Sequence, residues 1–144
     1  MTDMSNSPIG KSLQRREDVR FLTGAGQYTD DVLLPGQTHG VFLRSPYAHA
    51  RIKSIDVKAA KAAPGVIAIF TGADLAKAKV GGLPCGWLIH SKDGTPMKEP
   101  AHPVLAQGKV RHCGDQVALI VAESVALAKD AAELIEVDYD ELPA

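Results

Sequence analysis

The sequence is poor in cysteine and in net charge, and it lacks any long apolar run. Its two cysteines, Cys85 and Cys113, stand too far apart for the paired spacing of zinc or iron–sulfur sites. Lys and Arg number 16 against 17 Asp and Glu, so no basic patch for nucleic acid or anionic lipid is indicated. No stretch approaches the roughly 18 apolar residues of a membrane helix, and the first residues lack the pattern of a signal peptide. We therefore expect a cytoplasmic protein with reduced thiols and no membrane span.

What the sequence does contain is enough apolar material for one folded domain. Hydrophobic residues make up 45% of its 144 residues, which allows a core without disulfides or metals. Residues 1–8 are small and polar and are expected to form a flexible lead-in, and residues 9–144 are expected to form the domain. Strand-like stretches interspersed with two or three helical ones predict a mixed α/β fold.

A continuous apolar run and several shorter strand-like stretches mark the expected strands. The run "VIAIF" at 66–70 is bounded by Pro-Gly and Thr-Gly, so we expect a strand that is buried on both faces. Gly114 falls inside the strand-like run 109–124 and predicts a bulge or bend there. Further strands are expected around Val41 and Leu43, across Ile52, Ile55 and Val57, and over 136–144.

Helix signals occur in three segments. Pro64 ends a short helix that begins near 57, Thr71 is positioned to cap a second, and Ser124 to cap a third. Residues 9–31 show no sustained period and are expected to be extended or loop structure. Residues 80–104 contain four prolines and four glycines, which predicts a long exposed loop with a functional or partner-bound role.

Five blocks of the sequence, taken in order, resemble a known family. They read "RREDVRFLTGAGQYTDDVLLPG", "LRSPYAHARIKSID", "GVIAIFTGADL", "KVRHCGDQVALIVAES" and "AAELIEVDYDELPA". The chain resembles the N-terminal portion of the molybdopterin-binding large subunit in the xanthine dehydrogenase, aldehyde oxidase and aerobic carbon monoxide dehydrogenase family. The resemblance implies an α/β-hammerhead domain, a small mixed sheet with its helices.

The same resemblance implies that the chain is part of an oxidoreductase. The family uses a molybdopterin-bound molybdenum, iron–sulfur clusters and FAD, which implies an iron–sulfur subunit and a molybdenum-binding polypeptide or domain as partners. Because the family's molybdenum-binding residues lie downstream of the hammerhead, we expect this chain alone to bind no cofactor or metal and to be inactive. It departs from the family at Asp115-Gln116, where relatives typically have Glu or Gln and then proline; Gln116 restores a backbone N–H.

The stretch "RSPYAHARIKSID" at 44–56 and the long loop supply the candidate site residues. Arg44 and His49 are interpreted either as anchors for a cofactor phosphate or a neighbouring domain, or as the polar side of a solvated strand. The resemblance favours an architectural role. Trp87 is a candidate anchor for a partner subunit or part of a small-ligand site. Gly114 and Gln116 complete the interface candidates.

Other chemistry has simpler explanations in this sequence. His102, His112 and Cys113 lack the spacing of a metal site, and Cys85 and Cys113 are more typical of packed thiols than of nucleophiles. Lys98 in "PMKEP" suggests a swinging-arm carrier domain, but prolines flank it where a hairpin tip is expected. The alternative to a piece of an oxidoreductase is a free-standing interaction module, or a degraded fragment, without enzyme activity.

Overall fold

A computed structural model describes residues 10, 12 and 14–144, and the chain divides into two compact units. One unit ends at Gly36 and the other runs from Gln37 to Ala144. The expected lead-in at residues 1–8 lies outside the described residues. Within the described part of the chain, no helix is both long enough and apolar enough to cross a bilayer.

The unit that ends at Gly36 contains two short helices where the sequence predicts extended or loop structure. Helix α1 spans Asp18–Leu22 and the 3-10 helix η2 spans Thr29–Asp31. Phe21 and Tyr28 stack with their ring centroids 5.4 Å apart. Helices this short show no hydrophobic period, which is why the prediction for this segment was wrong.

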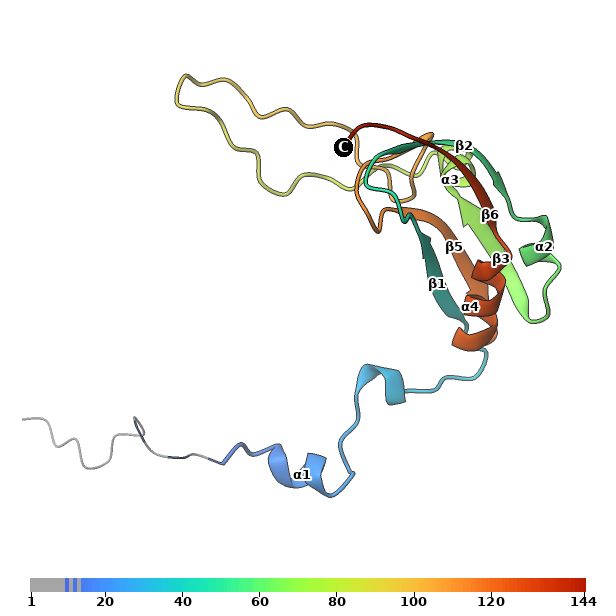
Figure 1. Cartoon of the computed structure of the whole chain (residues 1–144). Coiled ribbons are helices and arrows are strands. Elements are labelled where there is room, and N and C mark those ends of the chain that lie inside the picture. The colour runs from blue at the N-terminus through green and yellow to red at the C-terminus, as the bar shows by residue number, and fades with distance from the viewer. Residues whose placement is uncertain (1–9, 11, 13) are drawn as a thin grey trace, which may run out of the picture. The chain divides into compact units, whose positions relative to one another are not determined.

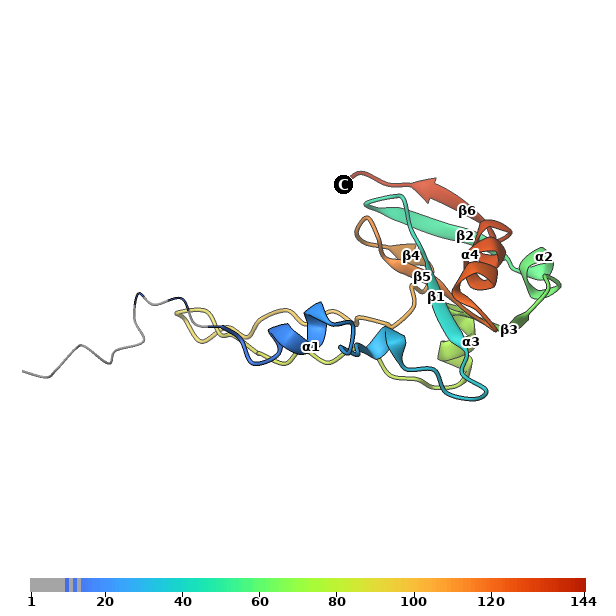
Figure 2. The same ribbon diagram turned by 90° about the horizontal axis from the view of Figure 1, so that it is seen from below.

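The first sheet of the larger unit is built around a buried central strand (Figure 1). Its order is β1-β5-β3, all antiparallel. On one face of β5, Ala118, Ile120 and Ala122 join a core cluster with helix α4, and on the other face Val117 joins a second cluster. Figure 2 shows α4 against this sheet. The bounds are β1 His39–Arg44, β3 Val66–Thr71, β5 Gln116–Ala122 and α4 Val125–Glu133.

The second sheet has an irregular central strand. Its antiparallel order is β4-β2-β6, with β4 at Lys109–Val110, β2 at Ala50–Asp56 and β6 at Glu136–Glu141. The register of β2 against β6 shifts between Ile52 and Ser54, which is a β-bulge. This bulge lets Ile52 and Ile55, three positions apart, both pack against the second cluster. Ile55 also packs against the first cluster, so the sheets share one apolar interior.

The helices predicted from their terminal residues are present. Helix α2 spans Lys58–Lys61 and α3 spans Gly72–Lys77. Ser124 Oγ accepts the Leu127 N–H at 3.2 Å, so the cap of α4 is confirmed. The observed fold confirms the predicted mixed α/β class.

The Thr71 cap of α3 centres on one carboxylate. The hydroxyl and the N–H of Thr71 both donate to Asp74 Oδ2 at 2.7 Å. These bonds favour the ionised form and lower the pKa of the Asp74 carboxyl below its ordinary value of 3.8.

Two strand predictions need correction. Strand β3 exists, but it is an edge strand, and its Ile67 and Phe70 are 55% and 40% exposed rather than buried. A short apolar run does not reveal whether its strand is central, and here the central strand is β5. Gly114 lies in the turn between β4 and β5 rather than inside a strand, and its φ of 87° is the left-handed conformation that glycine adopts without strain.

The 80–104 loop extends well beyond the sheets as two limbs (Figure 1). Every residue from 76 to 102 is exposed, which confirms the predicted long exposed loop. An isolated bridge pairs His90 with Pro96, and at the base the Leu83 N–H donates to the His102 carbonyl at 2.7 Å. The chain returns to the interior at Leu105, which is 2% exposed.

Candidate functional site

The turn from Arg111 to Asp115, between β4 and β5, is organised by one carboxylate. Asp115 Oδ2 accepts the backbone N–H of Arg111 at 2.9 Å and lies 3.9 Å from His112 Nδ1. The carbonyl of Asp115 accepts the N–H of Ser45 at 2.8 Å, which ties the turn to the end of β1. No sequence signal marks Asp115 or Arg111 as organising residues, because only the folded turn brings them together.

Three of the five candidate residues meet at this turn. Arg44 Nη1 donates to the Gly114 carbonyl at 2.9 Å, and its guanidinium carbon lies 5.8 Å from the Phe42 ring centroid. Arg44 also lies opposite Gln116 in the register of β1 and β5. The Gln116 carbonyl accepts the Ala106 N–H at 2.7 Å. These contacts brace the turn against both neighbouring segments.

His49 makes a separate set of contacts. Its Nδ1 lies 2.6 Å from the Pro143 carbonyl oxygen, and its own carbonyl accepts the Leu142 N–H at 2.9 Å. Because a carbonyl only accepts, Nδ1 carries the proton in this bond. His49 thus joins the segment before β2 to the residues that follow β6, and Arg44 and His49 bond to different partners.

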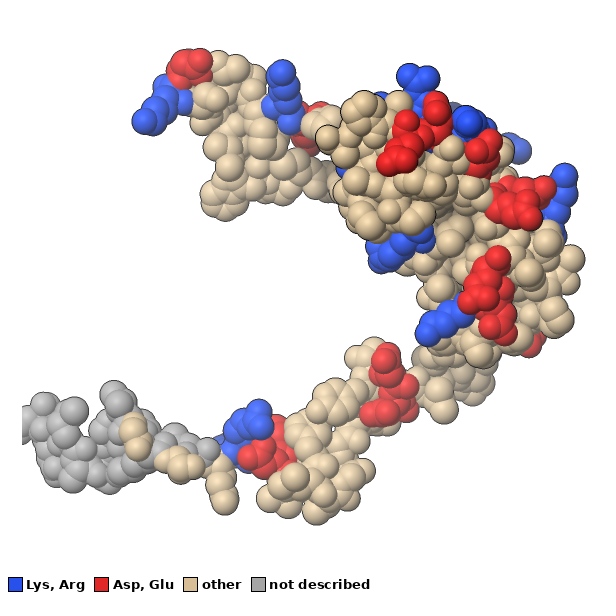
Figure 3. Space-filling view, viewed as in Figure 1, with Lys and Arg blue, Asp and Glu red and all other residues tan. Residues whose placement is uncertain are grey.

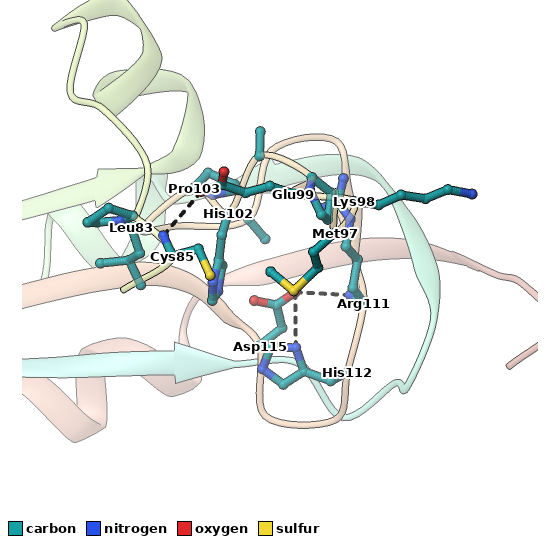
Figure 4. A pocket seen from close by; sticks show the side chains of 14 residues that line it. Leu83, Cys85, Met97, Lys98, Glu99, His102, Pro103, Arg111, His112 and Asp115 are labelled. Atoms are coloured by element: carbon teal, nitrogen blue, oxygen red, sulfur yellow. Dashed lines mark hydrogen bonds and ion pairs between the residues drawn. The ribbon is translucent and has the colours of Figure 1, made fainter. Parts of the chain in front are cut away.

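A pocket of about 410 Å³ lies between the base of the 80–104 loop and the turn (Figure 4). Figure 4 shows the Asp115 carboxylate facing Arg111 and His112, and Lys98 extending away from the other labelled side chains. On the loop side, the Cys85 N–H donates to Glu99 Oε1 at 3.3 Å. The lining mixes both charge signs with apolar side chains, so it selects for no single ligand chemistry.

Trp87 lies in the loop and is 78% exposed, next to Leu88 and Ile89 at 57% and 58%. Contiguous exposed apolar side chains are typical of interaction surfaces. Lys98 follows the His90–Pro96 bridge and does not lie at the tip that the bridge encloses. That position does not match a carrier lysine presented on a hairpin tip.

The cysteines lie outside the core. Both are free and exposed, so the interpretation as packed thiols is wrong. Cys85 Sγ donates to the Trp87 carbonyl at 3.3 Å, and Cys113 Sγ lies 3.6 Å from the Pro46 carbonyl oxygen. In the described part of the chain, no three or more His, Cys, Asp or Glu side chains are grouped so as to hold a metal ion. An iron–sulfur cluster requires four protein ligands, and neither cysteine belongs to such a group among the described residues.

Two small antiparallel sheets with a shared interior, short helices and a long exposed loop place the chain in the α/β-hammerhead class. A family model described as "Aldehyde oxidase and xanthine dehydrogenase, a/b hammerhead domain" matches residues 23–143. The chain belongs to this family, which confirms the resemblance drawn from the five blocks.

Similar proteins give the same result in sequence and in structure. The chain is 44% identical to the carbon monoxide dehydrogenase large chain of Afipia carboxidovorans, over 94% of this chain and 15% of that protein. It is 39% identical to the nicotine 6-hydroxylase large subunit of Paenarthrobacter nicotinovorans, over 96% of this chain and 16% of that protein. It superposes on quinoline 2-oxidoreductase from Pseudomonas putida 86 with a TM-score of 0.78 and 47% identity. The superposition covers 94% of this chain and 16% of that structure's chain. The chain therefore spans about one sixth of the length of these relatives.

Proposed function

We propose that the chain serves as the hammerhead portion of a molybdenum hydroxylase large subunit and that it docks and shields rather than reacts. The 80–104 loop supports this proposal most directly. Trp87, Leu88 and Ile89 each expose more than half of their surface, and burying apolar surface contributes about 25 cal/mol per Å². A partner that covers these side chains removes their apolar surface from water, and the complex is stabilised by that free energy.

The charge distribution agrees with such a division of roles. Figure 3 shows acidic and basic side chains interspersed over the sheets, while much of the 80–104 loop is uncharged. Interspersed charges are typical of a water-facing surface. Exposed aromatic residues at a patch with few charges are typical of the centre of an interface.

The proposed partners are a molybdenum-binding polypeptide or domain and an iron–sulfur subunit, within a cytoplasmic assembly that also uses FAD. Two of the relatives named above are described as a large chain or large subunit, and this chain matches about one sixth of each. The described residues contain no group of His, Cys, Asp or Glu side chains that could hold a metal ion, and in this proposal the metal and flavin chemistry belongs to the partners. The chain alone is expected to show no turnover.

The test is the Trp87→Ala variant of the full chain, captured with partners from its native host. A buried aromatic anchor commonly contributes at least about 2 kcal/mol to binding, so affinity should fall more than about tenfold. The readout is the molybdenum and iron content of the captured material together with the dissociation constant. Ile67→Ala is the control, because Ile67 is 55% exposed on edge strand β3 and lies outside the loop.

The possible results separate the two candidate functions. The docking role is supported if the chain captures molybdenum and iron, and if Trp87→Ala weakens this capture while Ile67→Ala leaves it unchanged. Equal capture by both variants contradicts the assignment of Trp87. Absence of both metals from every captured complex contradicts the assembly and favours the free-standing module, and a neighbouring coding sequence for a molybdenum-binding polypeptide would argue the other way.

A further inference from the structure

A second hollow, beside the residues that follow β6, is lined by basic side chains and by no Asp or Glu. Lys109 comes from β4, Arg111 and His112 from the turn, and His49 from the segment before β2. Its volume is about 560 Å³. We call it the basic hollow. It is distinct from the pocket at the base of the loop, although Arg111 and His112 contribute to both.

The cations of the basic hollow lack acidic partners. Among the described residues, no carboxylate lies within 4.0 Å of the Lys109 ammonium or the Arg111 guanidinium. His112 alone is paired, with Asp115 at 3.9 Å, and its side chain is 60% exposed. The Asp115 side chain is only 14% exposed, so its carboxylate offsets part of any charge on His112. Lys109 and Arg111 remain as positive charges in the hollow, and these attract anions.

We propose that the basic hollow binds a small tetrahedral oxyanion of the sulfate and phosphate class. The planar fork of Arg111 suits two oxygens of such an anion, and Lys109 adds a point charge. A tetrahedral oxyanion presents oxygens in several directions, which matches donors that arrive from β4 and the turn. Binding by the chain itself requires no partner subunit, so this inference does not depend on the proposed function.

One ring nitrogen of His49 is already engaged. Nδ1 is held by the Pro143 carbonyl, so Nε2 of the neutral ring is an acceptor. The neutral ring of His49 therefore offers an anion no donor, and the proposed binding rests on Lys109 and Arg111.

Other charged groups surround the basic hollow. Arg51 lies opposite Lys109 in the sheet, and Asp140 lies opposite Arg51. Glu141 lies at the end of β6.

The test is a titration of the full chain with sodium sulfate. Binding is monitored by backbone amide chemical shifts, and sodium chloride keeps the ionic strength constant. Sulfate is the probe because its charge is constant between pH 6 and 8. We expect saturable shifts at residues 49 and 109–113. The Lys109→Gln/Arg111→Gln variant should lose about tenfold in affinity for each removed cation, and phosphate should compete with sulfate for the same site.

Matched variants separate a site from a general charge effect. Lys129→Gln removes one positive charge from an exposed position on α4, outside the hollow, and should leave the affinity unchanged.

Several results would overturn the proposal. Shifts that follow ionic strength without saturating, or that appear away from the hollow, exclude a site there. If Lys109→Gln and Lys129→Gln bind sulfate with equal affinity, the binding reflects the net charge of the chain and not a site in the hollow. The native amide spectrum of each variant establishes that it is folded, and Lys109→Gln alone serves if the double variant is not.

Discussion

Strand β5 and the 80–104 loop give opposite surroundings to the same kind of side chain. Four of the seven residues of β5 are buried, and its flanking strands β1 and β3 satisfy its backbone groups. The loop carries Trp87, Leu88 and Ile89, yet every residue from 76 to 102 is exposed. Apolar character alone does not decide burial, because a side chain is covered only where other elements pack over it.

This difference separates stability from recognition in the molecule. The interior around Ile120 is covered from within the chain, so it contributes to folding. The loop side chains find no such cover within the described residues, so their burial awaits another surface. Changes in β5 should therefore alter the free energy of unfolding, and changes at the loop should alter binding.

The largest expected effect compares Ile120→Ala with Ile89→Ala. Ile120 is fully buried in the centre of β5, and its truncation should lower the free energy of unfolding by about 3 kcal/mol through lost contacts and a cavity. Ile89 is 58% exposed, and the same change there should cost less than about 0.5 kcal/mol. Urea unfolding measures both. Similar losses would mean that the loop packs on the core in solution.

Much of the fold was predictable because local signals agreed with the final packing. Ser124 is a preferred capping residue and caps α4, and Pro64 follows α2, where a helix cannot continue. The errors concern tertiary relations. "VIAIF" has the composition of a central strand but lies at an edge, and the bulge at Ile52 to Ser54 appears only when β2 pairs with β6.

The candidate site was predictable in part. Arg44, Gly114 and Gln116 were chosen separately, and the structure brings them together at one turn. Asp115 was noted only as a departure from the family, since its bonds to Arg111 and Ser45 depend on the folded backbone. The basic hollow has no sequence signature, because its residues come from separate positions that only the sheet register joins.

A smaller effect is expected when a capping hydroxyl is removed from the core helix. Ser124→Ala deletes the acceptor for the Leu127 N–H and should cost about 1 kcal/mol in the free energy of unfolding. Ser91→Ala is the control in the loop, where Ser91 bonds through its backbone to Thr95 and Gly94. Urea unfolding should register only the first change. An equal loss at Ser91 would show that the loop turn unfolds together with the sheets.

The smallest effect concerns two aspartates whose carboxyl pKa is lowered below 3.8, Asp74 in the first turn of α3 and Asp93 in the loop. The lowering comes mainly from hydrogen bonds donated by Thr71 and Thr95, respectively. A carboxyl whose pKa is lower in the folded state stabilises that state above the unfolded pKa, and the contribution is lost as pH falls through the folded pKa. Asp74→Asn should therefore reduce stability at pH 7 and make little difference near pH 2.

The two aspartates lie in the two regions under comparison, the sheets with their helices and the 80–104 loop, and their effects on the free energy of unfolding should differ. Because the Asp74 carboxyl is largely exposed, the loss at pH 7 should stay under about 1 kcal/mol. Asp93→Asn should leave global unfolding unchanged at both pH values, because its turn lies in the exposed loop and bonds only locally to Thr95. Urea unfolding at pH 7 and pH 2 measures both variants. A pH-dependent loss for Asp93→Asn would mean that the loop turn and the sheets unfold as one cooperative unit.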